Sequence, residues 1–483
     1  MKGNDRRWLK AVGAGVISTS LVLLVRGLGG LQAVDLWSYD LWLRRQPAVS
    51  QRERFLLVMV TDEDLVRLGQ DHIPLTTWQT LLFQLAERRP RVVGLDVTTL
   101  GNGGAAQVTA LNVANVPVVM GCSPLTPWES GGGLLVPVGR RGVPQLASTV
   151  LPRDSNVVRR YPLGGIVPPG VAGTCQPTHS LGLVVAVNYL AVQGITPHLE
   201  EGQALQLGRG RWRRLRSDSG PYQRLRVQGW QILLRSDPIV WEQVTLWQAL
   251  QGLPAAQVQG RVVLVGEQLQ GNGQPWYRTP RGQRHPQLWF HAQAVAQILD
   301  EALTGQGGIQ YWSEPWESLW IGVWGLVGVG LLGYGRHLAW GGMAGSGVII
   351  GIWLLSGSTW LPLAAPLLVW GLVLGMAPWC RRRPPLSARL PAPPEGTTQP
   401  SIPRGSFAES GQQWEGVQVG DGHRYLLQRH LGGGGMGDVF RALDQHLRKI
   451  VAVKILTRLP TETVHGDQII RRFQREIQVT ARI

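Results

Sequence analysis

Three long apolar segments near the middle of the chain limit what it can fold into. They are Ser318–Gly335, Leu338–Gly357 and Thr359–Trp379, and none of them contains a charged residue. Each is long enough to cross the hydrocarbon core of a bilayer. A helix in a soluble core would keep a polar face, whereas these segments have none and are rich in Gly and Trp. The sequence therefore predicts three transmembrane helices within residues 313–380.

A fourth apolar run lies at the N-terminus. Ala11–Val25 follows the basic stretch Met1–Lys10 and ends at Arg26. Counted from Trp8, it is just long enough to span a membrane. A cleaved signal peptide is the alternative, but no small-x-small cleavage site follows. Residues 1–26 are therefore predicted to be a cytoplasmic N-terminus and an uncleaved transmembrane helix.

The basic residues flanking these segments predict the topology. Met1–Lys10, Arg336 and Arg381–Arg383 are the positively charged flanks, and such flanks stay in the cytoplasm. They agree on a multi-pass cell-membrane protein with four crossings and with both termini in the cytoplasm. Residues 27–312 are then extracytoplasmic, and membrane lipid is an expected partner.

Residues 27–312 have the pattern of a folded α/β domain. Phe55–Val60 is a buried strand, and the next helix places Leu81, Leu82, Leu85 and Ala86 on one face. A second short strand follows, so strand, helix and strand suggest a βαβ unit with a parallel pair. A later helix places Ala292, Val295, Ala296 and Leu299 on its apolar side. Alternating strands and helices predict an extracytoplasmic α/β fold.

The net charge of +16 and the pI near 10.7 raise the question of nucleic acid. The arginines are scattered, and no groove-reading motif accompanies them. The densest cluster, Arg209–Arg216, lies in the extracytoplasmic region, where an exposed hairpin is expected. We therefore expect no nucleic-acid partner.

The chain has three cysteines. Cys122 and Cys175 both lie in the predicted external domain, where an oxidising compartment would allow them to pair. The sequence does not give their distance, so this pairing stays open. Cys380 is interpreted as a small apolar residue at the inner end of a membrane helix.

Residues 381–422 are rich in Pro, Ser and Thr in their central part, Pro384–Gln413. Such a composition cannot bury a core, and it predicts a cytoplasmic linker. A docking segment for a proline-reading domain is the alternative.

A glycine-rich loop follows the linker. Gly432, Gly434 and Gly437 form G-x-G-x-x-G, with Val439 two residues later. That spacing also opens dinucleotide-binding folds, where the loop runs into a helix. Here the following residues alternate as in a strand, so a hairpin over phosphates is predicted. Glycines allow the backbone amides to approach phosphate oxygens closely.

The next strand carries a lysine. On the strand VAVKIL, Val451 and Val453 should point one way and Ala452 and Lys454 the other. The small Ala452 would leave room for an adenine ring, and Lys454 would reach the α- and β-phosphates. A buried ammonium needs a partner, which Glu476 on a following helix would supply. Glu462, in a predicted loop, is the second candidate.

Residues 424–483 closely resemble the N-terminal lobe of bacterial eukaryotic-like serine/threonine protein kinases, through LGGGGMGDVF and VAVKIL. The resemblance implies an incomplete α+β kinase lobe over residues 423–483, with ATP and Mg²⁺ as cofactors and cytoplasmic proteins as substrates. It also implies catalytic roles for Lys454 and for Glu476, the helix glutamate that pairs with it. The implied ATP contacts are Leu431, Gly432, Gly433, Gly434, Gly435, Gly437, Val439, Ala452 and Lys454.

Most of residues 27–379 resembles the CHASE2 sensor domain of bacterial signalling receptors, through LLVMVTDEDLVRLG, RPRVVGLDVTT, GRVVLVGE and WFHAQAVAQILDEAL. That family often joins such a sensor to a cytoplasmic kinase or cyclase. The resemblance implies a multidomain membrane receptor with an extracytoplasmic ligand of unknown identity. Signal transfer through the membrane helices would favour a homodimer.

The kinase resemblance stops early. No His-Arg-Asp or Asp-Phe-Gly sequence follows Glu476 before Ile483, so the usual catalytic base and Mg²⁺ ligands are missing. We expect no metal site and no phosphate transfer in the 483 residues alone. We expect these 483 residues to be the first part of a longer receptor serine/threonine kinase. The alternative is a non-catalytic membrane sensor or binding protein with an inert kinase fragment. A transporter is disfavoured because the membrane segments contain no charge.

Three aspartates follow the two predicted parallel strands: Asp62, Asp64 and Asp96. Ligands of open α/β sheets bind at this edge, so a cation or polar-ligand site is one interpretation. Helix capping and solvation are the favoured interpretation. His179 and His291 show no spacing typical of a metal site.

Overall fold

The computed structural model describes residues 2–46, 49–97, 116–124, 127–128, 145–167, 175–200, 204–236, 238–269, 276–306, 308–334, 359–376, 414–434 and 437–455, with 111, 134 and 345. The described chain forms two compact units, Met1–Pro384 and Pro385–Ile483. Apart from Gly345, the predicted membrane segment 338–357 lies outside these residues, as does the predicted linker up to residue 413.

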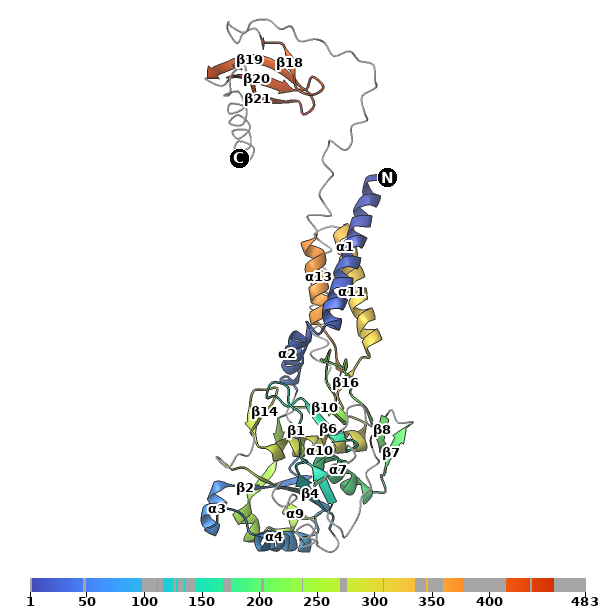
Figure 1. The fold of residues 1–483 in the computed structure, drawn as a ribbon, viewed down its shortest axis with the longest axis vertical. Coiled ribbons are helices and arrows are strands. Elements are labelled where there is room, and N and C mark those ends of the chain that lie inside the picture. The colour runs from blue at the N-terminus through green and yellow to red at the C-terminus, as the bar shows by residue number, and fades with distance from the viewer. Residues whose placement is uncertain are drawn as a thin grey trace. The chain divides into compact units, whose positions relative to one another are not determined.

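The first unit contains a six-stranded parallel sheet in the order β12-β2-β13-β3-β4-β5. Figure 1 labels two of these strands, β2 and β4. All six residues of β2 are buried, as expected for a strand covered on both faces. The strands are β2 (Phe55–Val60), β3 (Val92–Asp96), β4 (Val118–Cys122), β5 (Gln145–Ser148), β12 (Glu242–Thr245) and β13 (Val262–Glu267).

The sheet order differs in one respect from the predicted βαβ pair. β2 and β3 are parallel and belong to one sheet, but β13 lies between them and pairs with both. More than 160 residues separate β13 from β3 along the chain, so local pattern could not reveal this insertion. The strand order depends on packing between distant segments.

Helices cover both faces of the sheet. The first unit contains α1 (Lys2–Gly27), α2 (Gln32–Leu43), α3 (Asp62–Leu68), α4 (Leu75–Glu87), α7 (Leu181–Ala191), α8 (Leu246–Leu250), α9 (Ala255–Val258), α10 (Gln287–Thr304), α11 (Glu314–Tyr334) and α13 (Ala364–Gly375). Leu56 and Val58 of β2 face the cluster formed with α4, α8 and α9. Leu57 and Met59 face the opposite cluster, which α7 and α10 complete.

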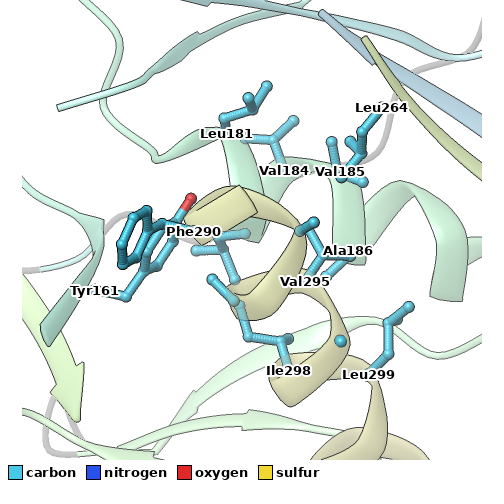
Figure 2. Packing of buried hydrophobic residues seen from close by; sticks show 14 of the residues in the cluster. Tyr161, Leu181, Val184, Val185, Ala186, Leu264, Phe290, Val295, Ile298 and Leu299 are labelled. Atoms are coloured by element: carbon cyan, nitrogen blue, oxygen red, sulfur yellow. The ribbon is translucent and has the colours of Figure 1, made fainter. Parts of the chain in front are cut away.

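The predicted helix faces are confirmed. On α4, Leu81, Leu82 and Leu85 are buried, and Ala86 packs against the same cluster. On α10, the four predicted residues Ala292, Val295, Ala296 and Leu299 are all buried. Figure 2 shows apolar side chains of α7 and α10 facing each other, with Leu264 of β13 beside Val185.

Smaller sheets surround this core. They contain β1 (Val49–Ser50), β6 (Arg160–Gly164), β7 (Pro197–Glu200), β8 (Ala204–Leu207), β9 (Gly210–Arg213), β10 (Trp230–Leu233), β11 (Ile239–Val240), β14 (Tyr277–Arg278), β15 (Arg284–His285), β16 (Gln310–Tyr311) and β17 (Thr359–Trp360). β8 and β9 pair antiparallel, so the start of the Arg209–Arg216 cluster forms the predicted hairpin.

Three helices at the ends of the first unit pack together. Val22 of α1, Ile321 of α11 and Val369 of α13 share one buried cluster. Among the described residues, only Trp8–Gly27 within α1 is both long and apolar enough to cross a membrane. α13 is a shorter apolar helix of twelve residues.

The predicted membrane helix Thr359–Trp379 is shorter than expected. Thr359 and Trp360 form β17, which pairs with β16, and Trp360 is fully buried with Tyr39 and Trp42 of α2. A tryptophan held in this cluster cannot also occupy the first turn of a lipid-facing helix. The helix therefore begins only at Ala364.

The second unit is described as a four-stranded antiparallel sheet. Its strands, in the order β18-β19-β20-β21, are β18 (Gln418–Val419), β19 (Tyr425–Gly434), β20 (Gly437–Asp444) and β21 (Lys449–Ile455). Leu427, Phe440 and Ala442 form its small core, against which Trp414 and Val419 pack. β18 falls within the predicted linker, so the folded sheet begins earlier than residue 423.

Candidate functional site

The glycine-rich stretch lies at the closed end of a β-hairpin. β19 and β20 run antiparallel, and their last paired positions are Gly434 and Gly437. The chain continues after Gly437 as a strand, which confirms the predicted strand–loop–strand geometry and excludes the Rossmann arrangement for this loop. Gly435, one of the predicted ATP contacts, lies outside the described residues.

The hairpin is open to its surroundings at Gly432. A Cβ atom added there would meet no atom of the described residues within 4 Å. Leu431, next to it, is 56% exposed. A surface lined by glycine backbone is compatible with a phosphate-bearing ligand, because glycine has no side chain to hold the amides away from that ligand.

β21 places Lys454 beside the hairpin. Lys454 is the paired neighbour of Val439 on β20, and Ala452 pairs with Arg441. Val451 and Val453 pack on the small core, whereas Ala452 and Lys454 are exposed. The predicted division of β21 into two faces is therefore confirmed, and it keeps the lysine away from the apolar core.

An ion pair holds the other end of the hairpin. Arg424 donates hydrogen bonds of 2.9 and 2.7 Å to the Asp444 carboxylate. Asp444 also accepts the backbone N–H groups of His446 and Leu447, which shape the turn into β21. The hydrogen bonds from Arg424 lower the pKa of Asp444 to about 2. This framework aligns β20 and β21, and hence Val439 and Lys454.

Glu476 lies outside the described residues, and so does Glu462. The pairing of Lys454 with either one therefore remains a prediction. Within the part of the chain that the structure describes, no three His, Cys, Asp or Glu side chains gather in a way that could hold a metal ion.

The external aspartates separate into two kinds. Asp64 accepts the Thr61 backbone N–H at 2.7 Å and the Trp247 N–H at 2.8 Å, and its own N–H completes a capping box with Thr61. Asp62 is the first residue of the same helix, α3. The favoured capping interpretation is therefore confirmed for Asp64. It does not hold for Asp96, which ends β3 and is buried.

Asp96 faces the first turns of α10. Gln287 donates a hydrogen bond of 3.1 Å to its carboxylate, and His291 Nε2 lies 3.8 Å from the same oxygen. Neither partner was predicted from the sequence. Gln287 and His291 are four residues apart and so share a helix face. That spacing was a readable signal, but nothing in the sequence placed α10 against β3.

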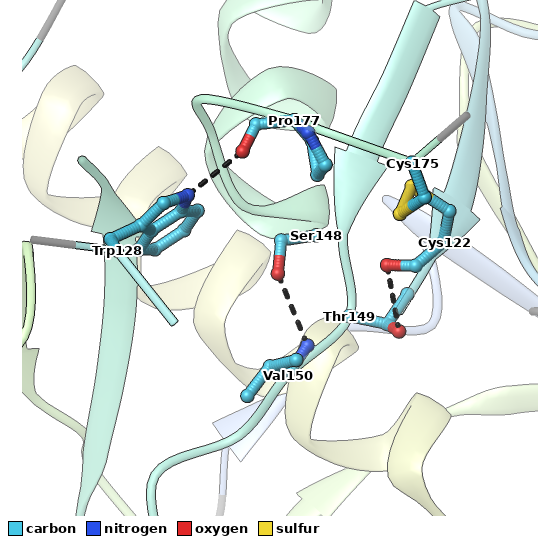
Figure 3. Close-up of a disulfide and its surroundings, with 7 residues drawn as sticks. All are labelled: Cys122, Trp128, Ser148, Thr149, Val150, Cys175 and Pro177. Atoms are coloured by element: carbon cyan, nitrogen blue, oxygen red, sulfur yellow. Dashed lines mark hydrogen bonds between the residues drawn. A yellow bond between two sulfur atoms is a disulfide. The ribbon is translucent and has the colours of Figure 1, made fainter. Parts of the chain in front are cut away.

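A disulfide lies at the carboxyl edge of the parallel sheet, where Asp96 also lies. Cys122, at the end of β4, is bonded to Cys175, with the two Cα atoms 5.9 Å apart (Figure 3). The backbone N–H of Thr149, just after β5, donates to the Cys122 carbonyl at 3.1 Å. The pairing left open by the sequence is therefore made, and it ties a loop to the carboxyl ends of β4 and β5.

A buried charge cluster joins α1, α2 and α11. Arg26 donates to Asp35 at 3.4 Å and also to Glu317, and all three side chains are buried. Gln223 donates to Asp35 at 2.7 Å. Burial raises the pKa of Asp35 to about 6, although Arg26 and Gln223 oppose that shift. One arginine thus connects the N-terminal helix α1 to both α2 and α11.

Most of the first unit matches a known protein family. Residues 17–330, more than half of the chain, match the CHASE2 domain. The chain belongs to the CHASE2 family. The matched CHASE2 residues begin within α1 and end within α11, so they include the parallel sheet, the disulfide and Asp96 with His291. CHASE2 domains are extracellular α/β sensors of membrane proteins.

Short stretches of the chain are also similar to protein kinases. A stretch of 70 residues, 14% of the chain, is 41% identical to "Serine/threonine-protein kinase PknE" of Mycobacterium tuberculosis (strain ATCC 25618 / H37Rv) and covers 11% of it. A stretch of 60 residues, 12% of the chain, is 35% identical to "Probable serine/threonine-protein kinase pknA2" of Bifidobacterium longum (strain NCC 2705) and covers 8% of it. The CHASE2 chain thus spans only about a tenth of these relatives. No solved structure matches it.

Proposed function

We propose that these residues belong to a transmembrane receptor serine/threonine kinase, in which an extracytoplasmic CHASE2 domain controls ATP-dependent phosphorylation of cytoplasmic proteins. The observation that carries the proposal is the β19–β20 hairpin with Lys454 paired beside it on the exposed face of β21. The similarity to two bacterial serine/threonine kinases supports it.

The hairpin would bind the triphosphate through its backbone. Gly432, Gly433, Gly434, Gly435 and Gly437 would present N–H groups to phosphate oxygens, since no side chain intervenes. Leu431, Val439 and Ala452 would enclose the adenine ring. Lys454 would bind the α- and β-phosphates, and Glu476 would keep its ammonium in place.

Phosphoryl transfer needs groups that the sequence after Lys454 does not supply. No His-Arg-Asp or Asp-Phe-Gly motif occurs between Lys454 and Ile483. Bound Mg²⁺ would neutralise charge on the phosphates, and its ligands belong to those motifs in protein kinases. We therefore assign ATP binding, not catalysis, to the 483 residues themselves.

The proposed topology has four membrane crossings, with residues 27–312 outside and both termini in the cytoplasm. The packed helices α1, α11 and α13 support it, because Leu24 of α1, Leu326 of α11 and Leu367 of α13 point apolar side chains outward. Lipid would cover such surfaces. The Cys122–Cys175 disulfide also supports an external domain, because disulfides persist in oxidising compartments.

The nucleotide site can be tested on the chain as it stands. An acyl-phosphate derivative of ATP transfers its acyl group to a lysine that lies beside the bound phosphates. We expect mass spectrometry to find Lys454 acylated, and millimolar ATP to suppress the reaction. In a protein that carries a complete kinase domain, Lys454→Met should also abolish autophosphorylation.

Lys449→Met is the matched control, because Lys449 lies on the same strand and is exposed too. It should leave acylation of Lys454 and autophosphorylation unchanged. Equal labelling of Lys449 and Lys454, or labelling that ATP does not suppress, would refute the assignment of Lys454. Specific ATP binding without autophosphorylation by the complete protein would favour a non-catalytic sensor.

A further inference from the structure

Among the described residues, Asp96 is a buried acid without a basic partner. It ends β3 at the carboxyl edge of the parallel sheet, and the residue is only 6% exposed. The hydrogen bond that its carboxylate accepts from the described residues is the 3.1 Å contact from Gln287. No arginine or lysine of the described residues forms an ion pair with it. A buried carboxylate normally has a cation or several donors, so the site is incomplete.

His291 presents a second unsatisfied group to the same place. Its ring is fully buried, and Nε2 makes no hydrogen bond of normal geometry among the described residues, although the Thr149 backbone lies close enough to interact with the ring. Nδ1 lies 2.7 Å from the Tyr161 hydroxyl, whose oxygen accepts the Gly182 N–H at 2.8 Å. We assign the hydroxyl proton to the bond with Nδ1, which leaves the ring proton on Nε2. That N–H group faces Asp96 across 3.8 Å.

Two glycines make this arrangement possible. A Cβ at Gly182 would come within 2.6 Å of the Tyr161 hydroxyl, so only glycine allows that hydroxyl to reach the first turn of α7. A Cβ at Gly266 would come within 2.8 Å of Leu288, so a glycine on β13 allows α10 to approach the sheet. Close approach of α10 is what brings Gln287 and His291 to Asp96. The carboxyl edge of such a sheet is also where ligands of α/β folds bind.

The groups around Asp96 oppose its ionised form. Among the described residues, the titratable side chains near enough to interact electrostatically with Asp96 are Glu267 on β13, His291 on α10, Tyr161 on β6 and Tyr277 on β14. None of these is a permanent cation, and Glu267 repels the carboxylate. Burial raises the pKa of Asp96 to about 7, with a further rise from Glu267 and a partial offset from Gln287.

Burial also lowers the pKa of His291, to about 3, although the Thr149 backbone partly offsets that change. The imidazole is therefore neutral and is not a counter-ion for the carboxylate. The two groups together hold no fixed charge when Asp96 is protonated and one negative charge when it is not.

We infer that Asp96 and His291 form a proton-binding site in the CHASE2 domain. When Asp96 loses its proton, the carboxylate attracts the Nε2–H group, and closing the 3.8 Å gap would move α10 relative to β3. α10 leads through β16 into α11 within ten residues, so the movement has a short route towards the membrane. The idea that this site reports external pH rests on the proposed topology, whereas the proton site itself does not.

Infrared spectroscopy of the full chain in nanodiscs tests the site. A buried protonated carboxyl has a distinct C=O band, which we expect to disappear with a midpoint near pH 7 as pH rises. Labelling with ¹³C-carboxyl aspartate should shift the band, which identifies it as an aspartate without any mutation. Asp35, whose pKa is about 6, would contribute a band of its own, so the variants are compared in an Asp35→Asn background. There Asp96→Asn should lack the band, and Asp64→Asn should keep it, because Asp64 is held by the α3 cap.

His291→Phe separates a positioning role from a purely structural one. Removing the Nε2–H donor withdraws the group that favours the carboxylate, so the midpoint should rise while the band remains. With Asp35 replaced by Asn, a titrating aspartate band that persists in Asp96→Asn would overturn the inference. So would the lack of any such band between pH 5 and 9 while Asp96 is present. Failure of ATP labelling at Lys454 would leave this result untouched, so the two proposals fail separately.

Stability gives a second readout. A carboxyl whose pKa is 3.8 when unfolded and about 7 when folded holds its proton more tightly in the folded state. Stability therefore falls as pH rises. From pH 5.5 to 8.5, this one group should raise the unfolding constant about 30-fold. The increase should be missing from Asp96→Asn, and an equal increase in both proteins would count against the site.

Discussion

At the scale of single residues, the lack of a side chain at Gly182 leaves room for the Tyr161 hydroxyl. The Tyr161 hydroxyl accepts the Gly182 N–H and orients His291, and the ring carbon Cζ of Tyr161 would lie 2.9 Å from an added Cβ. Tyr161 is buried in the cluster shared by α7 and α10 (Figure 2), and Gly182 is buried on α7. The tyrosine therefore has little room to withdraw from a larger neighbour.

We expect Gly182→Ala to lower the free energy of unfolding by about 1–3 kcal/mol, as overpacking of a filled core usually does. Denaturant unfolding measured by tryptophan fluorescence checks this value. Gly322→Ala is the control, since a Cβ there would meet no atom of the described part of the chain within 4 Å. Similar, small effects of the two substitutions would show that Tyr161 is not packed as described.

At the scale of elements, Arg26 of α1 forms ion pairs with both α2 and α11. It pairs with Asp35 near the start of α2 and with Glu317 in the first turn of α11. Asp35 Oδ1 and Glu317 Oε1 are both buried without a hydrogen-bond partner among the described residues. The cluster thus contains two acidic side chains and one arginine. The stability of the cluster should therefore depend strongly on that arginine.

Arg26→Gln should destabilise the full chain by about 3–5 kcal/mol, because it leaves buried carboxylates without a cation. Thermal unfolding in nanodiscs measures the effect. The triple variant with Asp35→Asn and Glu317→Gln should recover part of the loss. Arg67→Gln, which removes an exposed pair with Glu63, should cost less than about 1 kcal/mol. Equal costs for Arg26→Gln and Arg67→Gln would exclude the proposed role of Arg26.

Several elements were predictable because their signals are local. The apolar run of β2, the apolar stripe of α4 and the alternation of β21 each follow from neighbouring residues. The glycine hairpin was predictable for the same reason, since its glycines and the following alternation lie within a few residues.

Other features depend on distant contacts and could not be read from the sequence. β13 enters between β2 and β3, and Trp360 leaves its predicted helix to pack against Tyr39. Asp96 meets His291, almost two hundred residues later, only because α10 packs against β13. The predicted partner of Lys454, Glu476, lies outside the described residues and stays a prediction.

At the scale of the whole molecule, a receptor kinase requires its two functional parts to lie on opposite sides of the membrane. The CHASE2 domain with its disulfide is expected outside the cell, and the hairpin with Lys454 is expected in the cytoplasm, where ATP is abundant. These locations follow from four crossings and from the basic flanks Met1–Lys10 and Arg381–Arg383. A receptor kinase needs this separation, because signal and substrate are then on opposite sides of the membrane.

Paired reporter fusions test that separation most directly. Green fluorescent protein and alkaline phosphatase, which are active on the inner and outer sides of the bacterial membrane respectively, would each be fused after Gly305 and after Arg383. We predict active phosphatase and no fluorescence after Gly305, and fluorescence without phosphatase activity after Arg383. Active phosphatase after Arg383 would place the nucleotide hairpin outside the cell and contradict the receptor-kinase account.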